Sequence, residues 1–416
     1  MKLQILDMSK TNLIAPFFTA ILFSAFIYME HFGLSNQIVE MIFGLTSIYL
    51  ILNLDKRSLF FTGFFIGILW FFWIGFSMRY YGLTYLIPIV ILFFGLLYGF
   101  FFYLIGYYKN IWFRGVLLIL VNFVEPFGFN WFKPQIIFVN TPIGTELWQF
   151  GIVVFGVIAI FEILKIKKYP LLLPALIFLS FSLNFGVENL DRNLPFEIKI
   201  VETKVKQNEK WLLKNEQKIV DMNIKQIELA IKEGYKLVIL PESTFPLFIN
   251  SYQNIVNTLL KLSQDISILT GGLYSENGNY YNASYLFQNG TYQVAKKVVL
   301  VPFGEYIPLP KILSDWINNL FFDGSKDFTS AKKPTDFTIH GHIFRNAICY
   351  EASSEELYKD SRKYMIAISN NGWFLPSIEP TLQKLLIQHF SNINGVTVIR
   401  SANIEGSGVI YPRFLD

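Results

Sequence analysis

Cysteine and charge are both scarce in this sequence. Cys349 is the only cysteine among 416 residues, so an internal disulfide is excluded and cysteine usage does not identify the redox compartment. Charged residues make up 16% of the chain and hydrophobic residues 53%, which is less charge than soluble domains usually carry. The net charge is only +4, and no Arg-rich or Gly-rich phosphate-binding motif accompanies it. We therefore expect no nucleic acid partner.

The hydrophobic residues are concentrated before residue 190. From about residue 191 onward Lys, Glu, Asn and Ser return, as in a soluble domain. A helix that crosses a bilayer core needs roughly 17 to 20 apolar residues. Seven runs approach or exceed this length: 13–29, 37–54, 59–78, 82–106, 111–131, 145–164 and 170–187. The sequence therefore predicts a transmembrane bundle of about seven helices at 1–190 and a second domain at 191–416.

Five charged residues lie in these runs, of which Glu146 and Glu162 are at the two ends of the sixth. Glu40 lies in the second, and Arg114 and Glu125 lie in the fifth, which makes these two the weaker predictions. No small-x-small cleavage site follows the first run, so we expect an anchor rather than a removed signal peptide.

The distribution of cations predicts the orientation of the bundle. If the N-terminus is cytoplasmic, the outer loops hold only Arg79 and Lys133. The inner segments then hold nine cations: Lys2, Lys10, Lys56, Arg57, Lys109, Arg114, Lys165, Lys167 and Lys168. With an odd number of spans, this bias places everything after residue 190 outside the cytoplasm.

The second domain shows strands that alternate with helices and hairpins. We predict strands at 196–205, 236–240, 343–349 and 364–369, a helix with Val220, Ile224, Ile227 and Ile231 on one face, and a later helix marked by Leu382, Leu385, Leu386 and His389. Asn289-Gly290 separates two alternating segments and predicts a type I′ hairpin. This pattern is typical of a layered α/β domain.

Three reactive side chains lie at or near the ends of these strands. Glu242 follows the strand at 236–240, Lys297 lies in the return strand of the hairpin, and Cys349 ends the strand at 343–349. A carboxylate can take a proton from a thiol, and an ammonium can stabilise the thiolate and an oxyanion, so the three suit acyl transfer through a thioester. The alternative is that Cys349 is an ordinary core residue and the two charges are solvated.

Three sequence blocks resemble one enzyme family. LPESTFP (240–246), KVVLVPFGEYIPL (297–309) and ICYE (348–351) resemble the signature blocks of apolipoprotein N-acyltransferases, the membrane branch of the carbon-nitrogen hydrolase (nitrilase) superfamily. The resemblance implies an N-terminal transmembrane bundle followed by an extracytoplasmic αββα nitrilase-like domain.

The resemblance also implies roles for individual residues. It makes Glu242 the general base, Lys297 the cation that stabilises the intermediate, and Cys349 the nucleophile. Lys296 and Lys297 face opposite sides of a strand, and the spacing to Gly304-Glu305 matches the family's lysine to Lys297. It further implies three supporting residues, Glu305, Tyr350 and Glu351. We expect three residues to bind the substrate: Trp211, Asn371 and Trp373.

The implied reaction transfers a fatty acyl chain between two lipids. Cys349 would take the chain from a membrane phospholipid, phosphatidylethanolamine in the family, and pass it to the N-terminal amine of a diacylglyceryl-cysteine apolipoprotein. The resemblance implies no cofactor and no metal. It places the protein in the bacterial inner membrane, with the catalytic domain on the periplasmic side.

The sequence departs from the family pattern near its end. The helix TLQKLLIQHFSNIN lacks the arginines usual there, Asn371 stands where Asp is common, and SANIEGSGVIYPRFLD after Arg400 is too short and mixed for the family's final transmembrane helix. We therefore expect either a short subgroup or a truncated chain.

The same sequence features also fit other functions. The same triad would serve a membrane-tethered nitrilase-type amidase that acts on a small amide. A non-enzymatic membrane protein with a decayed domain is a second alternative. His340 and His342 in IHGHI raise the question of a metal site, but two His without a third ligand are more often an exposed turn.

Overall fold

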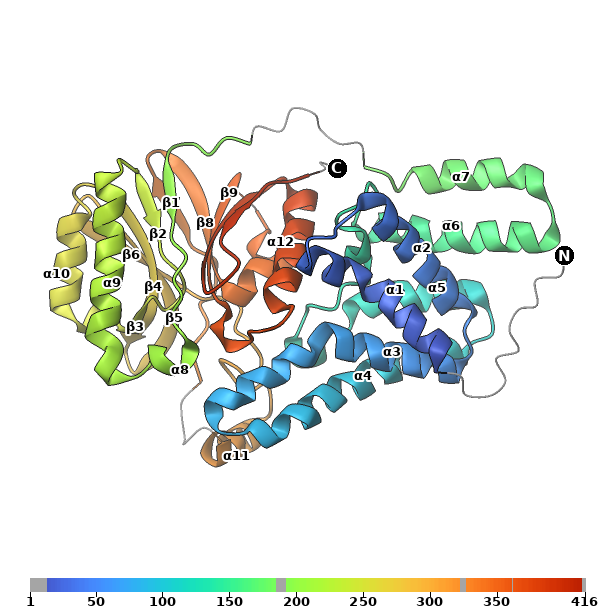
Figure 1. The fold of residues 1–416 in the computed structure, drawn as a ribbon, viewed down its shortest axis with the longest axis horizontal. Helices are drawn as coiled ribbons and strands as arrows, with labels where there is room; N and C mark the ends of the chain where they lie inside the picture. The colour runs from blue at the N-terminus through green and yellow to red at the C-terminus, as the bar shows by residue number, and fades with distance from the viewer. Residues whose placement is uncertain (1–12, 185–191, 322–326, 361, 414–416) are drawn as a thin grey trace. The chain divides into compact units, whose positions relative to one another are not determined.

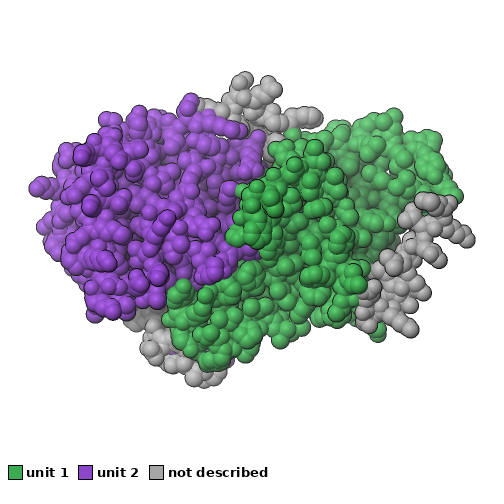
Figure 2. Space-filling view, in the orientation of Figure 1, with its two compact units in different colours: residues 1–125, 132–186, 416 green, residues 126–131, 187–415 purple. Residues whose placement is uncertain are grey.

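The computed structural model describes residues 13–184, 192–321, 327–360 and 362–413. The chain divides into two compact units, drawn in green and purple in Figure 2. The first takes in residues 1–125 and 132–186, and the second takes in residues 126–131 and 187–415. The boundary predicted near residue 190, like Lys2 and Lys10 of the cation count, lies outside the described residues.

The first unit is helical throughout its described elements. Its α-helices are α1 (Ile14–His31), α2 (Gln37–Asn53), α3 (Lys56–Phe71), α4 (Ile87–Tyr107), α5 (Ile111–Leu120), α6 (Leu147–Ile166) and α7 (Leu172–Ser180). Its 3-10 helices are η1 (Phe72–Tyr81), η2 (Thr84–Leu86), η3 (Val121–Phe123), η5 (Pro134–Phe138) and η6 (Tyr169–Leu171). Among the described residues, four helical segments are long and apolar enough to cross a membrane: 14–31, 56–81, 84–107 and 147–166. The apolar segments at 37–53, 111–123 and 169–180 are shorter.

The predicted fifth run, 111–131, is shorter in the structure than the sequence indicated. Its helix ends at Phe123, and Pro126 to Trp131 belong to the second unit. Pro126 lacks the backbone N–H that a continuing helix needs, and Glu125 forms an ion pair with Lys133 at 2.9 Å. Hydrophobicity alone did not reveal that residues 111–125 belong to the first unit and residues 126–131 to the second.

Arg114, the unexpected charge in that run, contacts the ends of two helices. Its guanidinium donates to the carbonyls of Leu52 and Leu54 at the end of α2 and to those of Gly106 and Tyr108 at the end of α4. The last carbonyls of a helix have no partner within it, so a cation there satisfies acceptors that would otherwise be left unpaired. Arg114 is therefore a structural residue of the first unit.

The second unit contains two β-sheets. The first sheet has the order β1 (Ile198–Ile200), β2 (Leu237–Ile239), β4 (Ser267–Glu276), β5 (Asn279–Gln288), β6 (Thr291–Lys296), with β3 (Phe245–Phe248) also paired to β4. The second has the order β11 (Gly408–Ile410), β10 (Thr397–Asn403), β9 (Tyr364–Asn370), β8 (His342–Ile348), β7 (Asp336–Ile339). The α-helices are α8 (Gln207–Lys210), α9 (Leu213–Lys232), α10 (Gln253–Leu262), α11 (Lys311–Phe321) and α12 (Glu379–Asn394). The 3-10 helices are η4 (Pro126–Gly128), η7 (Ile249–Ser251), η8 (Cys349–Ser353), η9 (Glu355–Leu357) and η10 (Asn371–Trp373).

Alternating side chains build this unit into four layers (Figure 1). In β2, Val238 packs against α9 and α10, whereas Leu237 and Ile239 pack against the second sheet. In β9, Ile366 faces the first sheet and Met365 faces α12. Because both faces of both sheets are covered, the strands are apolar on each side. The αββα architecture expected from the sequence is confirmed.

The predicted hairpin is present, but its return strand ends one residue early. Asn289 and Gly290 both have positive φ angles, 51° and 70°, as a type I′ turn requires. β6 ends at Lys296, so Lys297 lies just beyond the return strand rather than in it. The amide of Lys297 still donates to the carbonyl of Asn282, which holds it beside β5.

The strand predicted at 196–205 is limited to three residues, Ile198–Ile200. The chain leaves the first sheet there, because Thr203 forms a bridge with Asn403 of the second sheet. His340 and His342 flank the β7–β8 turn and are exposed, as the turn interpretation predicted.

Candidate active site

The predicted site residues follow the ends of three strands. Glu242 comes three residues after β2, Lys297 directly after β6, and Cys349 directly after β8, at the start of η8. Cys349 has a φ of 55°, and Ser243, next to Glu242, has a φ of 48°. Residues other than Gly rarely adopt this left-handed backbone conformation, and those that do are concentrated at functional sites.

Gly271 of β4 allows the turn that carries Glu242 to approach the sheet. A Cβ atom at this position would lie 2.6 Å from the amide nitrogen of Ser243 and 2.7 Å from the Cα of Glu242. Both are backbone atoms that cannot move aside, so glycine is required here. The sheet thereby fixes the place of Glu242.

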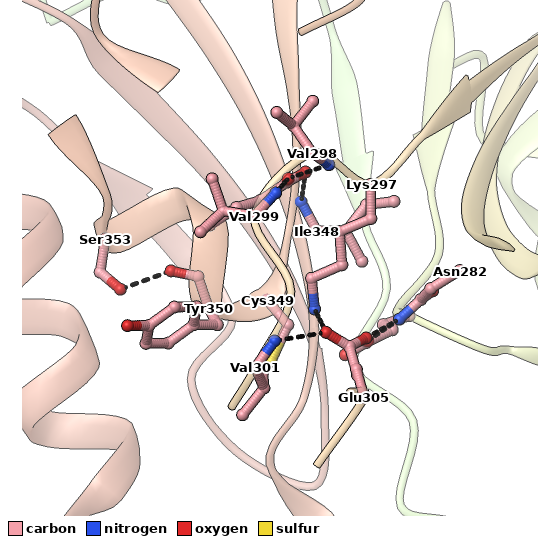
Figure 3. A network of polar contacts seen from close by, with 12 residues as sticks. Asn282, Lys297, Val298, Val299, Val301, Glu305, Ile348, Cys349, Tyr350 and Ser353 are labelled. Atoms are coloured by element: carbon pink, nitrogen blue, oxygen red, sulfur yellow. Dashed lines mark hydrogen bonds and ion pairs between the residues drawn. The ribbon is translucent and has the colours of Figure 1, made fainter. Parts of the chain in front are cut away.

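A network of side chains joins Glu242 to Lys297 through Asn282 and Glu305. Figure 3 shows its part from Asn282 through Glu305 to Lys297. The amide of Asn282 donates to Glu242 Oε1 at 2.7 Å and to Glu305 Oε1 at 2.8 Å. Glu305 Oε2 lies 2.8 Å from Lys297 Nζ and also accepts from the amide of Val301 at 2.8 Å. We call Glu242, Asn282, Lys297 and Glu305 the base cluster.

Lys297 is held in its charged form. Burial, with only 1% of the side chain exposed, favours the neutral amine, but the carboxylates of Glu305 and Glu242 favour the ammonium more strongly. The net result is a pKa of Lys297 well above its ordinary value. A permanent positive charge therefore lies within the base cluster.

Glu351 ties the segment after Lys297 to the segment before Cys349. One carboxylate oxygen accepts from the amide of Ile348 at 2.8 Å, and the other accepts from the amides of Val298 at 2.8 Å and Val299 at 3.1 Å. Burial raises the pKa of Glu351 to about 7, although Lys297 and these amides act in the opposite direction. Glu351 thus fixes the relative position of two predicted catalytic residues.

Tyr350 packs against residues 126–131, the separate stretch of the second unit. Its ring stacks on Phe129 and Trp131, with centroids 5.9 and 5.7 Å away, and its hydroxyl donates to Asn130 Oδ1 at 2.7 Å. Trp131 also donates to the hydroxyl of Ser353 at 2.7 Å. The stretch therefore supports the turn that begins at Cys349.

The surroundings of Cys349 favour its thiol form over the thiolate. Its burial raises the pKa of the thiol well above the ordinary value, and the carboxylates of Glu242, Glu379 and Glu305 raise it further, whereas Lys297 lowers it. Nucleophilic attack by this sulfur would therefore require a base to take its proton.

Sequence reasoning missed a second buried lysine at the site. Lys210, at the end of α8, is 2% exposed, and its Nζ donates to the backbone carbonyl of Glu242 at 3.0 Å. Burial lowers the pKa of Lys210 to about 8, although Glu242 and Cys349 favour the charged form. The available signal was its position directly before Trp211, a residue already matched to the family.

Three polar residues behind Cys349 were also missed. Gln383 of α12 has its Nε2 3.9 Å from Cys349 Sγ, and Arg400 of β10 donates to the Oε1 of the same Gln383. Glu379 lies four residues before Gln383 on α12, is 1% exposed, and interacts electrostatically with Arg400. We call Glu379, Gln383 and Arg400 the α12 cluster.

The predicted substrate-binding residues differ in exposure. Trp211 is 42% exposed and Trp373 is half-buried, so both have surface available for a ligand. Asn371 is fully buried, and its amide donates to the carbonyl of Glu405 at 2.7 Å. In this structure Asn371 holds the β10–β11 turn.

Comparison with known families defines the class first. Residues 10–184 match the apolipoprotein N-acyltransferase integral membrane domain, and residues 206–413 match the carbon-nitrogen hydrolase domain. The protein is thus a membrane protein that carries a domain of the carbon-nitrogen hydrolase fold.

Curated relatives then give the family. An apolipoprotein N-acyltransferase from Wolinella succinogenes is 42% identical over 98% of this chain and 97% of its own length. One from Helicobacter hepaticus is 36% identical over 91% of this chain and 94% of its own. The chain belongs to the apolipoprotein N-acyltransferase family. Among solved structures, a carbon-nitrogen hydrolase from Helicobacter pylori G27 is 12% identical with a TM-score of 0.38, over 52% of this chain and 79% of that one.

Proposed function

We propose that this protein transfers a fatty acyl chain from a membrane phospholipid to the N-terminal amine of a diacylglyceryl-cysteine lipoprotein. Its near full-length relationship to proteins named apolipoprotein N-acyltransferase supports lipoprotein N-acylation. The single structural observation that carries the mechanism is the base cluster beside Cys349, which supplies a carboxylate and a fixed ammonium.

In the first half-reaction, Cys349 Sγ attacks the ester carbonyl of the phospholipid. Asn282 occupies Glu242 Oε1, so Oε2 is the oxygen that takes the thiol proton. Lys297 stabilises the oxyanion of the tetrahedral intermediate, and its pairing with Glu305 keeps it in place. Collapse breaks the bond to the lipid alkoxide, which leaves with the proton from Glu242 and becomes the lysophospholipid hydroxyl.

In the second half-reaction, the neutral α-amine of the lipoprotein attacks the thioester carbonyl. Glu242 takes a proton from the attacking nitrogen, and Lys297 again stabilises the oxyanion. The carbon–sulfur bond then breaks, an amide forms, and the departing thiolate recovers the proton. Water must be kept from the thioester, because its attack would turn transfer into phospholipid hydrolysis.

The location and the substrates complete the proposal. We propose residues 1–190 as the transmembrane bundle and 191–416 as the catalytic domain, in the bacterial inner membrane with the domain on the periplasmic side. The distribution of cations supports this orientation. We propose phosphatidylethanolamine as the donor, with Trp211 and Trp373 contacting the lipid substrates. Two substrates held in one leaflet meet by lateral diffusion, which replaces a search through water.

The test is intact-mass analysis of the full chain in phosphatidylethanolamine nanodiscs. We expect the wild-type protein to gain one fatty acyl group and to lose it when a diacylated lipopeptide is added, with triacylated lipopeptide as the product. Cys349→Ala is expected to gain no acyl group and to transfer none, while still inserting into the membrane.

Two results would count against the proposal. Acyl transfer by Cys349→Ala at the wild-type rate would remove Cys349 from the reaction. Release of ammonia from small amides, without any dependence on lipid, would instead favour the membrane-tethered amidase.

A further inference from the structure

The α12 cluster places a hydrogen-bond donor next to Cys349: Gln383 Nε2 lies 3.9 Å from Cys349 Sγ. Gln383 is fully buried in α12, and the mechanism proposed above does not use it. The distance is at the long end for a hydrogen bond to sulfur, so the amide lies next to the atom that is proposed to react.

Arg400 fixes which end of the Gln383 amide faces the sulfur. A guanidinium carries five donors and no acceptor, so it must meet the carbonyl oxygen of Gln383. The amide nitrogen then points to Cys349. That nitrogen can only donate, and a thiolate accepts a hydrogen bond far better than a thiol does.

The charge of Arg400 lacks a full partner before reaction. Arg400 is 2% exposed, its Nε has no hydrogen-bond partner among the described residues, and neither has Glu379 Oε2. Burial raises the pKa of Glu379 to about 8, so this carboxyl is mostly protonated at neutral pH. Burying an uncompensated charge is costly. The thiolate of Cys349 is the anion that forms nearby during the reaction.

We propose that Gln383 is a further catalytic residue that donates a hydrogen bond to the Cys349 thiolate whenever it forms or departs, and that Arg400 is the positioning residue that orients the amide. The inference rests on the proposed role of Cys349 as the nucleophile. No proton leaves Gln383: the thiol proton passes to Glu242, and the amide stabilises the negative sulfur left behind.

Other charged groups also act on Cys349 and set the background of any pH profile. They are Glu242, Lys297 with Glu305, Glu379, Arg400 and Lys210. A test of Gln383 must therefore change the amide without changing these charges.

The only cysteine of the chain provides a clean readout. Full-length protein in detergent is alkylated with iodoacetamide from pH 6 to 10, and the rate is followed by intact mass. We expect Gln383→Leu to lower the alkylation rate about tenfold at each pH below the pKa of the thiol. This is the change that a rise of about one unit in that pKa produces, as expected for loss of one hydrogen bond to a charged group. Gln388→Leu is the matched control, because Gln388 is a buried amide of the same helix that bonds Asn392 and the carbonyl of Tyr411 instead.

Arg400 is tested through the double variant. Arg400→Met is expected to slow alkylation, and adding it to Gln383→Leu is expected to cause little further loss, because Arg400 acts through the amide. The proposal would be overturned if the alkylation rates of Gln383→Leu were within twofold of the wild-type rates across the pH range. It would also be overturned if the effects of Gln383→Leu and Arg400→Met on the rate were fully additive. Alkylation is measured without lipid, whereas the proposed function is tested by acylation from phospholipid. The role of Gln383 can therefore be disproved while Cys349 is still acylated, and it can be supported even if Cys349 is not acylated.

Discussion

The base cluster and the α12 cluster both act electrostatically on Cys349 but satisfy their charges differently. In the base cluster, Lys297 pairs with Glu305, and Asn282 bonds both Glu305 and Glu242. In the α12 cluster, Arg400 donates to a neutral amide. A paired network holds its geometry before the substrate arrives, whereas an unpaired charge is compensated when the thiolate appears. The two clusters therefore suit different moments of one reaction.

The two buried lysines near the site show the same contrast. Lys297 lies 2.8 Å from a carboxylate, and its pKa is well above the ordinary value. Lys210 donates to a backbone carbonyl, and burial lowers its pKa to about 8. Equal burial with different partners thus gives one permanent cation and one amine that titrates near neutral pH.

The largest effect is expected from the base itself. Glu242→Gln keeps the shape of the side chain but cannot take the thiol proton, so acylation by phospholipid is expected to fall by about 10²- to 10⁴-fold. The measurement is single-turnover acylation of Cys349 followed by intact mass. Glu276→Gln is the control, because Glu276 is an exposed carboxylate paired with Lys296. Near wild-type acylation by Glu242→Gln would show that another group takes the proton.

A slightly smaller effect is expected from the permanent cation. Lys297→Met removes the charge that stabilises the oxyanion, and acylation is expected to fall by about 10²- to 10³-fold. Lys296→Met is the matched control: the adjacent lysine pairs with Glu276 and lies over the rings of Tyr274 and Tyr281. Equal losses in the two variants would show that the choice of Lys297 is wrong.

Lys210 is expected to have a more modest effect that depends on pH. Its charge favours the thiolate below pH 8 and is lost above it, so acylation without any amine acceptor is expected to decline above about pH 8. Lys210→Met is expected to lower the rate about tenfold at pH 7 and to remove this decline. Lys210→Arg is expected to keep the rate at pH 7 and also to remove the decline, because its guanidinium stays charged above pH 8. The omission of the acceptor matters, because the α-amine of the acceptor has a pKa in the same range. If the acylation rate of Lys210→Met still declined above about pH 8, another group would be responsible for the decline.

The sequence predicted the base cluster better than the α12 cluster for a physical reason. Glu242 and Cys349 follow buried apolar strands, and strand alternation separates Lys296 from Lys297, so local patterns mark these positions. Gln383 and Arg400 meet only because α12 packs on the second sheet, and each looks like an ordinary polar residue in its own segment. Nothing local distinguishes Gln383, which contacts the sulfur, from Gln388 on the same helix.

The fold shows the same limit. Asn289-Gly290 specifies its turn through two positive φ angles, which is a local requirement that the sequence displays. α5 ends at Leu120 and the following η3 at Phe123, and residues 126–131 pack instead against Tyr350, more than 200 positions later. A hydrophobic run contains no record of such a partner, so the predicted helix extended too far.

The smallest expected effect concerns stability and tests whether Glu379 is neutral. The raised pKa means that folded Glu379 keeps its proton up to about pH 8, whereas the unfolded chain loses it near pH 4.5. The folded state therefore binds more protons across this interval, and stability falls as pH rises, by up to about 1.4 kcal/mol per pH unit. Glu351, with a pKa of about 7, adds a similar slope below pH 7, so the interval from pH 7 to 8 isolates Glu379.

Glu379→Gln removes this slope. Its melting temperature in detergent is expected to match that of the wild type near pH 5 and to exceed it by a few degrees at pH 8. The slope amounts to about 4 kcal/mol over this interval, and 1 kcal/mol corresponds to roughly 1 °C in a chain of 416 residues. Lys210 acts in the opposite direction, but only above pH 8, where the folded chain loses a proton that the unfolded chain keeps. A constant difference in melting temperature from pH 5 to 8 would mean that Glu379 is ionised beside Arg400. The charge of Arg400 would then be compensated before reaction, and the contrast between the two clusters would disappear.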